Sequence, residues 1–145
     1  VSAFLLNRSS DLTLCYIIDF LPQQVPKECG GQFFKVEEYL LGHNERYGLK
    51  DRLIRVILKI MCYYPISVYC HGWIEQPTPE QVAVLIDGIR EKQVGDVNIL
   101  FASKDVLLQL AGDSLNINIY NPDEEMSELF EKIAVSEGLF WRKAE

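Results

Sequence analysis

From Ile66 onward, short apolar runs of strand length alternate with amphipathic stretches of helix length, and this alternation constrains the fold more than any other feature. Ile66–Cys70 and Val97–Ala102 are apolar runs typical of strands covered on both faces. Leu115–Tyr120 alternates apolar and polar residues with a period of two, as a half-buried strand does. The alternation predicts a βαβαβα unit with right-handed crossovers and a largely parallel sheet.

The helices of this unit have recognisable boundaries. Thr78–Gln81 reads Thr-Pro-Glu-Gln, which combines an N-cap threonine, a proline at the first helical position and a capping box. Asn121–Glu124 repeats the order of a cap, a proline and an acid three residues on, so a last helix is expected with Asn121 as its cap. That helix runs to about Glu137, and Gly138 is expected to adopt the left-handed conformation that ends many helices.

Three shorter segments complete the prediction for the C-terminal half. A short helix is expected over Ser103–Leu110, because Ser103 can serve as its cap and Gly112 can end it. Leu139–Trp141 is expected to add a short final strand. The segment Gly72–Pro79 is bounded by glycine and proline, which predicts a loop.

The N-terminal half adds strands and helices to this unit. Ser2–Leu6 and Leu12–Phe20 are β-favouring runs separated by turn-forming residues, which predicts an N-terminal hairpin at one edge of the sheet. Helices are expected over Phe33–Leu41 and Leu49–Cys62, the second with a broad apolar face. The expected fold class is therefore α/β: a mixed sheet with an N-terminal β-hairpin and a C-terminal βαβαβα unit, helices packed on the sheet. A length of 145 residues fits a single domain over 1–145.

The four cysteines predict a reducing compartment. No two of them have C-x-x-C spacing, and a chain of 145 residues with 48% hydrophobic content does not need disulfide bonds to fold. The segment Val1–Ser10 has no basic region ahead of an apolar stretch, and no apolar run approaches the ~20 residues of a membrane span. We therefore expect four free thiols, no signal peptide, no membrane partner and a cytoplasmic location.

The net charge of −7 is concentrated in the second half of the chain. Residues 1–72 carry a balance of +1, whereas residues 73–145 carry a balance of −8. An acidic half repels nucleic-acid phosphate and attracts basic protein surfaces. Arg52, Arg55 and Lys59 lie opposite the apolar face of one predicted helix, but three cations without exposed aromatic neighbours are a poor footprint for RNA. A protein partner is therefore expected, and no nucleic acid.

No motif in the chain points to catalysis. There is no phosphate-binding glycine loop, no G-x-S-x-G and no metal-ligand spacing, so we expect a protein that is not an enzyme and has no cofactor and no metal. His71 follows Cys70 at the carboxyl end of a predicted strand, where α/β folds place their sites. Neighbours in a strand point to opposite faces, so a nucleophilic pair would require Cys70 to meet His43 instead.

Acidic residues at the start of the last predicted helix are the first candidate for partner binding. The candidates are Asp123, Glu124, Glu128 and Glu131. Acids in a first helical turn complement the helix dipole, which gives them a purely structural interpretation. Glu124 and Glu128 are spaced i,i+4 and repel each other, as do Glu128 and Glu131 at i,i+3, so a docking surface for cations is the competing interpretation.

Trp73 and Glu75 are the second candidate for partner binding. Tryptophan is enriched at binding hot spots, although a tryptophan at a strand end often covers the core instead. These residues also suggest a different function, a small α/β enzyme or ligand-binding domain with its site at the strand ends near His71 and Trp73.

Small size, acidity and the absence of catalytic motifs together resemble the immunity proteins of bacterial toxin–immunity systems. The segment from Tyr120-Asn121-Pro122-Asp123 through Glu137-Gly138-Leu139-Phe140 is similar to the end of bacterial proteins of this kind. The resemblance implies an inhibitory protein-binding protein that neutralises a basic toxin, a nuclease for example, by covering its functional surface. A homodimeric structural adaptor is a further alternative that the sequence leaves open.

Overall fold

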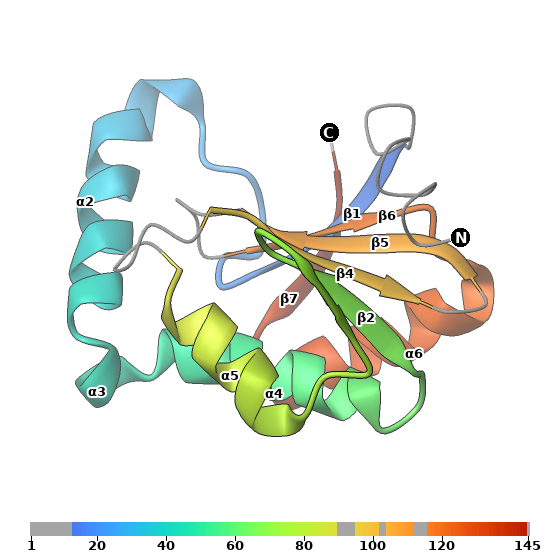
Figure 1. Cartoon of the computed structure of the whole chain (residues 1–145). Coiled ribbons are helices and arrows are strands. Elements are labelled where there is room, and N and C mark those ends of the chain that lie inside the picture. Colours follow the sequence, from blue (N-terminus) through green and yellow to red (C-terminus); the bar gives the residue numbers. More distant parts are fainter. Residues whose placement is uncertain (1–12, 90–94, 102–103, 112–115, 145) are drawn as a thin grey trace.

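Seven strands form one sheet in the computed structural model (Figure 1). The structure describes residues 13–89, 95–101, 104–111 and 116–144. The strands are β1 (Leu14–Asp19), β2 (Ile66–Tyr69), β3 (Trp73–Glu75), β4 (Val97–Phe101), β5 (Lys104–Leu110), β6 (Ile117–Tyr120) and β7 (Phe140–Lys143). Their order across the sheet is β3-β2-β4-β5-β6-β1-β7, and each described pair of neighbours is antiparallel.

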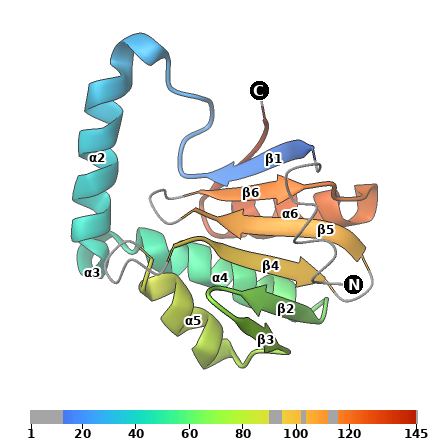
Figure 2. The same cartoon turned by 45° about the horizontal axis from the view of Figure 1, so that its top comes forward.

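Helices α4, α5 and α6 cover one face of this sheet, and α2 stands beside it (Figure 2). The helical elements are the 3₁₀ turn η2 (Lys27–Cys29), α2 (Gly30–Gly42), α3 (Asn44–Tyr47), α4 (Leu49–Met61), α5 (Pro79–Asp87) and α6 (Glu124–Ser136). The mixed α/β class with helices packed on the sheet is confirmed. Among the helices that the structure describes, none has the length and apolar character to cross a membrane.

The core lies between α4 and the inward face of the sheet. Leu53, Val56, Ile57 and Ile60 recur at helical spacing on one side of α4, and all four are buried. They share one apolar cluster with inward residues of the central strands, among them Ile99. Full burial of one such side chain is worth about 1.5–3 kcal/mol, so this face anchors α4 to the sheet.

The expected parallel sheet is wrong, and two unforeseen strands explain the difference. The predicted loop after β2 instead forms the short strand β3, which pairs with β2 and reverses the chain before α5. β4 therefore returns antiparallel to β2. β5 reverses the chain again and lies between β4 and β6. Each extra strand thus turns an expected parallel neighbour into an antiparallel one.

β5 replaces the helix predicted over Ser103–Leu110, of which Ser103 lies outside the described residues. Val106 and Leu108 belong to the main core, while Leu107 packs against Leu100 in a second cluster on the other face. A strand buried on both faces loses the period of two that identifies strands in a sequence. Tertiary packing here overrides the helix propensity of the leucines.

The expected N-terminal hairpin is described only in part. Its second strand corresponds to β1, whereas its first strand, Ser2–Leu6, lies outside the described residues. The expected place at the sheet edge is wrong, because β1 pairs with β6 on one side and with β7 on the other. β6 and β7 therefore run in the same direction, and α6 connects them with β1 inserted between them.

The two predicted helix starts have different outcomes. At α5 the capping box is confirmed. Thr78 Oγ1 accepts a hydrogen bond from the backbone amide of Gln81 at 3.2 Å, and the side-chain oxygen Oε1 of Gln81 accepts one from the backbone amide of Thr78 at 2.9 Å. At α6 the cap is Asp123, not Asn121. Asn121 has a φ of 58° and donates through its side-chain amide to the carbonyl of Asp105, so it closes a turn ahead of the helix.

The helix predicted over Phe33–Leu41 is confirmed within α2, but its apolar stripe is only partly buried. The expected stripe consists of Phe33, Val36, Tyr39 and Leu40. Val36 is 42% exposed and Tyr39 is 48% exposed, whereas Phe33 and Leu40 are half-buried. The reason lies in the position of α2 beside the sheet, where it contacts η2, α3 and α4.

Candidate functional site

The start of α6 is fixed to the sheet by Asp123. Its Oδ1 accepts a hydrogen bond from the Met126 amide at 2.8 Å, and its Oδ2 lies 2.7 Å from Lys104 Nζ at the start of β5. The hydrogen bond from Lys104, followed by that from the Met126 amide, holds the pKa of Asp123 below its usual value. Asp123 thus has a structural role as cap and tether, whatever else it contacts.

The remaining acids of α6 form an exposed surface, which we call the acidic face. It consists of Glu124, Glu125, Glu128 and Glu131, and all four are exposed. The spacing of Glu124, Glu128 and Glu131 places them along one side of the helix. The acidic face therefore brings together three of the residues predicted from the sequence and adds Glu125.

A shallow groove of about 330 Å³ lies along the acidic face. Its walls are formed by Tyr63 and Tyr64 from the turn between α4 and β2 and by four residues of α6, Glu125, Glu128, Leu129 and Lys132. The Tyr63 side chain is 64% exposed. Two carboxylates outnumber the one cation of the lining, Lys132, and share the groove with an exposed aromatic ring. This combination suits a cationic side chain, because the net negative charge attracts it and the ring can stack on it.

Tyr64 links the groove to the core. Its ring packs edge-on against Phe101 and Phe130, with centroid separations of 5.7 and 6.4 Å. Burial raises the pKa of Tyr64, and the negative charges of Glu125 and Asp123 raise it further. The groove wall therefore rests on rigid core aromatics, which lowers the entropy lost when a partner binds.

Trp73 and Glu75 do not join the acidic face. They lie in the edge strand β3, so the predicted loop around them is wrong. Trp73 packs edge-on against Tyr69 at 5.0 Å, and Glu75 accepts a hydrogen bond from the Ser67 hydroxyl at 2.6 Å. These side chains lie on the sheet face opposite α4, because their cross-strand partners alternate with the inward residues of β2.

The register aligns Trp73 with a row of polar residues that runs across the sheet. Tyr69, Asn98, Gln109 and Asn118 follow it on successive strands. Gln109 donates to Asn98 Oδ1 at 3.0 Å, and Asn98 donates to the Tyr69 carbonyl at 3.4 Å. The side chains of Gln109 and Asn98 are therefore engaged with each other and with the backbone of β2, so they stabilise the sheet face and are not poised for a ligand.

The turn between β2 and β3 holds Cys70 and His71 but lacks the properties of a catalytic pair. Burial, followed by the negative charge of Asp96, raises the pKa of Cys70, which keeps the thiol protonated, the opposite of an activated nucleophile. His71 is exposed, with a φ of 63°. His43 is engaged elsewhere, stacked on Tyr39 with its Nδ1 2.8 Å from the Tyr39 carbonyl. In the described ranges, no group of His, Cys, Asp and Glu side chains could hold a metal ion. All four cysteines are free.

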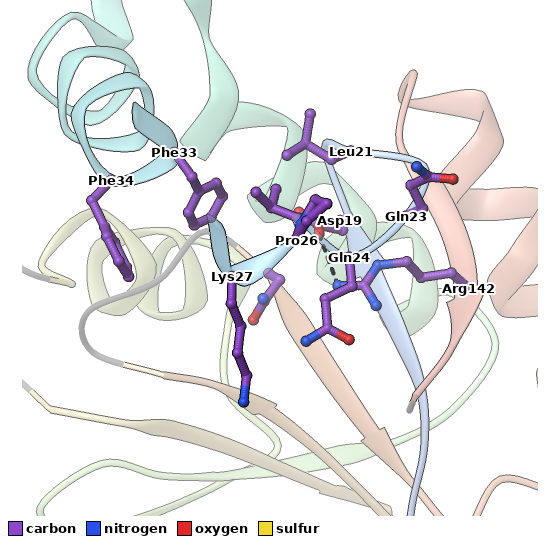
Figure 3. A pocket seen from close by; sticks show the side chains of 11 residues that line it. Asp19, Leu21, Gln23, Gln24, Pro26, Lys27, Phe33, Phe34 and Arg142 are labelled. Carbon is purple, nitrogen blue, oxygen red and sulfur yellow. Dashed lines mark hydrogen bonds and ion pairs between the residues drawn. The ribbon is translucent and has the colours of Figure 1, made fainter. Parts of the chain in front are cut away.

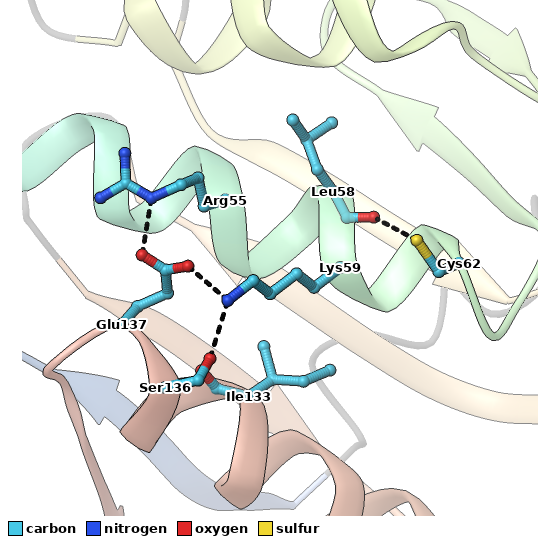
Figure 4. A network of polar contacts seen from close by, with 7 residues as sticks. All are labelled: Arg55, Leu58, Lys59, Cys62, Ile133, Ser136 and Glu137. Carbon is cyan, nitrogen blue, oxygen red and sulfur yellow. Dashed lines mark hydrogen bonds and ion pairs between the residues drawn. The ribbon is translucent and has the colours of Figure 1, made fainter.

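The cations of α4 make a structural contact with the end of α6 (Figure 4). Arg55 Nε donates to Glu137 Oε1 at 2.6 Å, and Lys59 Nζ lies 2.6 Å from Glu137 Oε2. Lys59 also donates to the Ser136 hydroxyl at 2.9 Å. Arg55 and Lys59 therefore join two helices.

Comparison with known protein families, with curated proteins and with solved structures finds no match. The candidate site is therefore interpreted from its own geometry. The sequence predictions include Glu124, Glu128 and Glu131 but miss Tyr63 and Tyr64. The signal that could have identified them is the pair of adjacent tyrosines between the end of a helix and Pro65. Turns lie at the protein surface and often carry binding residues, so aromatic side chains in a turn are candidates for contact with a partner.

Proposed function

We propose that this protein binds a basic protein partner through the acidic face and the adjoining Tyr63, and that it inhibits that partner by covering its functional surface. The observation that carries the proposal is the shared groove, in which two carboxylates, Glu125 and Glu128, outnumber Lys132 and lie beside the exposed Tyr63. Tyrosine is among the residues that dominate binding energy at interfaces. Carboxylates around it steer a cationic partner and set its orientation.

An immunity-type role fits this chemistry. A nuclease, the example that the sequence suggests, binds phosphate through basic residues, and a row of carboxylates occupies such a surface in place of phosphate. The charge of the chain supports this role, since the balance after residue 72 is −8. A toxin with a cationic functional surface is therefore the partner we propose.

Capture of the partner with matched baits tests this function. The acidic-face variant combines Glu124→Lys, Glu128→Lys and Glu131→Lys. The control variant combines Glu28→Lys, Glu45→Lys and Glu80→Lys, which are exposed acids outside α6 and change the net charge equally. From lysates of cells that contain the natural partner, the wild-type and control baits should recover the same basic protein. The acidic-face variant should recover at least about tenfold less of it.

The captured protein must also be inhibited. Its activity, or the growth arrest that it causes when expressed alone, should be relieved by the wild-type chain and not by the acidic-face variant. Equal capture and equal relief by both triple variants would contradict the proposal.

The alternatives use other surfaces. An enzyme with its site near His71 is disfavoured by the protonated Cys70 thiol and by the engagement of His43 described above. A homodimeric adaptor would use the exposed apolar side chains of α2, and sedimentation equilibrium of the purified chain separates that alternative from a monomer.

A further inference from the structure

A cavity of about 360 Å³ opens between the segment that leaves β1 and the first turns of α2 (Figure 3). Its volume lies within the range of small-molecule pockets, which is roughly 300–1,000 Å³. Its walls come from parts of the chain that are far apart in sequence, including Asp19, Phe33 and Arg142. It shares no lining residue with the groove on the acidic face, so it is a separate site.

One wall of the cavity is apolar and aromatic. It is formed by Leu21, Val25, Pro26, Phe33 and Phe34. Phe33 lies between two other rings, with centroid distances of 6.3 Å to Phe20 and 5.4 Å to Phe34. Phe34 is 65% exposed although it lines the cavity. A ligand with an apolar body would remove this ring from water and gain affinity by doing so.

The opposite wall holds a buried ion pair. Arg142 Nη2 donates to Asp19 Oδ2 at 3.2 Å, and the side chains of Arg142 and Asp19 are 15% and 8% exposed. Asp19 Oδ1 accepts a second hydrogen bond, from the Phe20 amide at 2.8 Å. Both oxygens of the carboxylate are therefore engaged within the protein.

The guanidinium of Arg142, by contrast, has an unsatisfied donor. Its bond to Asp19 uses one of five N–H groups, and its buried Nε has no hydrogen-bond partner. Buried donors are almost always paired in folded proteins, so an arginine at a cavity wall whose Nε lacks a partner is well suited to an anionic ligand.

The charges around the cavity select the sign of the ligand. The lining contains two cations, Lys27 and Arg142, and one carboxylate, that of Asp19, which gives it a net charge of +1 in a chain of −7. We propose that this cavity binds a small organic monoanion with an apolar body, such as an aryl-substituted carboxylate. The apolar body packs against Phe33 and Phe34, and the anionic group lies toward Arg142 and Lys27.

Titration of the full chain with 4-phenylbutyrate tests this site, and the neutral 4-phenylbutyramide serves as the matched ligand. Amide chemical shifts around the cavity should saturate with 4-phenylbutyrate at millimolar concentrations or below. The neutral amide should bind at least about tenfold more weakly, because it lacks the charge-assisted hydrogen bond. Failure of the carboxylate to saturate by about 20 mM, or equal affinity of both ligands, would overturn the proposal.

Two lysine variants separate the cavity charge from the charge of the whole protein. Lys27→Glu turns the charge of the lining from +1 to −1, while Lys35→Glu makes the same change on an exposed residue of α2 outside the cavity. Lys27→Glu should weaken the binding of 4-phenylbutyrate by about tenfold or more and leave the binding of the neutral amide unchanged. Lys35→Glu should change the affinity for either ligand by no more than about twofold. Equal effects of the two variants would overturn the proposal.

A third variant tests the apolar wall. Phe34→Ala removes an exposed ring, so the fold is expected to tolerate it. This variant should weaken the binding of 4-phenylbutyrate and of the neutral amide by the same factor, since both ligands bury the same phenyl group. Unchanged affinity of both ligands would place the binding outside this cavity and overturn the proposal.

Discussion

Gly138 ends α6 by a backbone conformation that other residues adopt at a cost. Its φ is 72°, its amide donates to the Val135 carbonyl at 3.0 Å, and the next amide, that of Leu139, donates to the Ala134 carbonyl at 3.0 Å. These two bonds define a Schellman motif, in which a glycine avoids the clash of a Cβ atom with the backbone. The motif directs the chain from α6 into β7.

Gly138→Ala should lower the free energy of unfolding by about 1–2 kcal/mol, the cost of the left-handed conformation for a residue with a side chain. The new Cβ would lie 3.3 Å from Arg52 Nη1, the end of a flexible side chain that can move, so the backbone carries most of the cost. Urea denaturation measures the change. Gly42→Ala is the matched control, because a Cβ there meets open space and the change should stay within about 0.5 kcal/mol. Equal losses in both variants would contradict this explanation.

Residue-level features can be predicted from the sequence where they depend on nearby residues. The capping box at Thr78 and the left-handed Gly138 were both predicted, since each motif lies within a few positions of the chain. The cap of α6 was not. The choice of Asp123 over Asn121 depends on Lys104 and Asp105, which the sheet brings close from an earlier strand.

At the scale of elements, Glu137 controls how α4 and α6 meet. Its side chain is 7% exposed and accepts hydrogen bonds from Arg55 and Lys59 (Figure 4). Burial alone would raise the pKa of Glu137, but the hydrogen bonds from Lys59 and Arg55 outweigh it and lower the pKa below its usual value. A lowered pKa in the folded state means that ionised Glu137 stabilises the fold above the unfolded pKa of about 4.3.

Glu137→Gln should therefore reduce the free energy of unfolding by about 1–3 kcal/mol at pH 7, since it leaves two cations with a neutral partner. The difference in free energy of unfolding between the variant and the wild type should be constant at neutral pH. It should shrink as pH falls below about 4.3, because the wild-type carboxylate then becomes protonated and is also neutral. Urea denaturation across this range measures it. Glu131→Gln, on the exposed side of α6, should change stability by less than about 0.5 kcal/mol. A loss at Glu137 that does not depend on pH would contradict the ionic explanation.

The elements that the sequence predicts correctly are those with one clear period. α4 has a single apolar face, and β6 alternates buried and half-buried residues. The strand β5 was missed because it is buried on both faces. The strand β3 was missed because its three residues are too few to show a pattern. These two omissions were enough to change the predicted sheet from parallel to antiparallel.

At the scale of the whole molecule, candidate surfaces differ in how far the sequence can reveal them. The acidic face was predicted because Glu124, Glu128 and Glu131 lie on one helix at regular spacing. Tyr63 joins it only because α4 and α6 pack side by side. The cavity beside α2 was not predicted, because Asp19 and Arg142 are 123 positions apart and meet only across β1 and β7.

The central claim is that the acidic face guides a basic partner into place, and the association rate constant tests it most directly. Once the partner has been purified, the constant is measured at increasing salt for the wild type, the acidic-face variant and the control variant. Charges at the rim of an interface mainly change the rate at which the two proteins encounter each other. Their effect weakens as the screening length falls from ~10 Å at 0.1 M to ~3 Å at 1 M salt. We expect the acidic-face variant to associate at least about tenfold more slowly at low salt, and the three proteins to converge at high salt. Equal rate constants for the acidic-face and control variants at every salt concentration would contradict the claim.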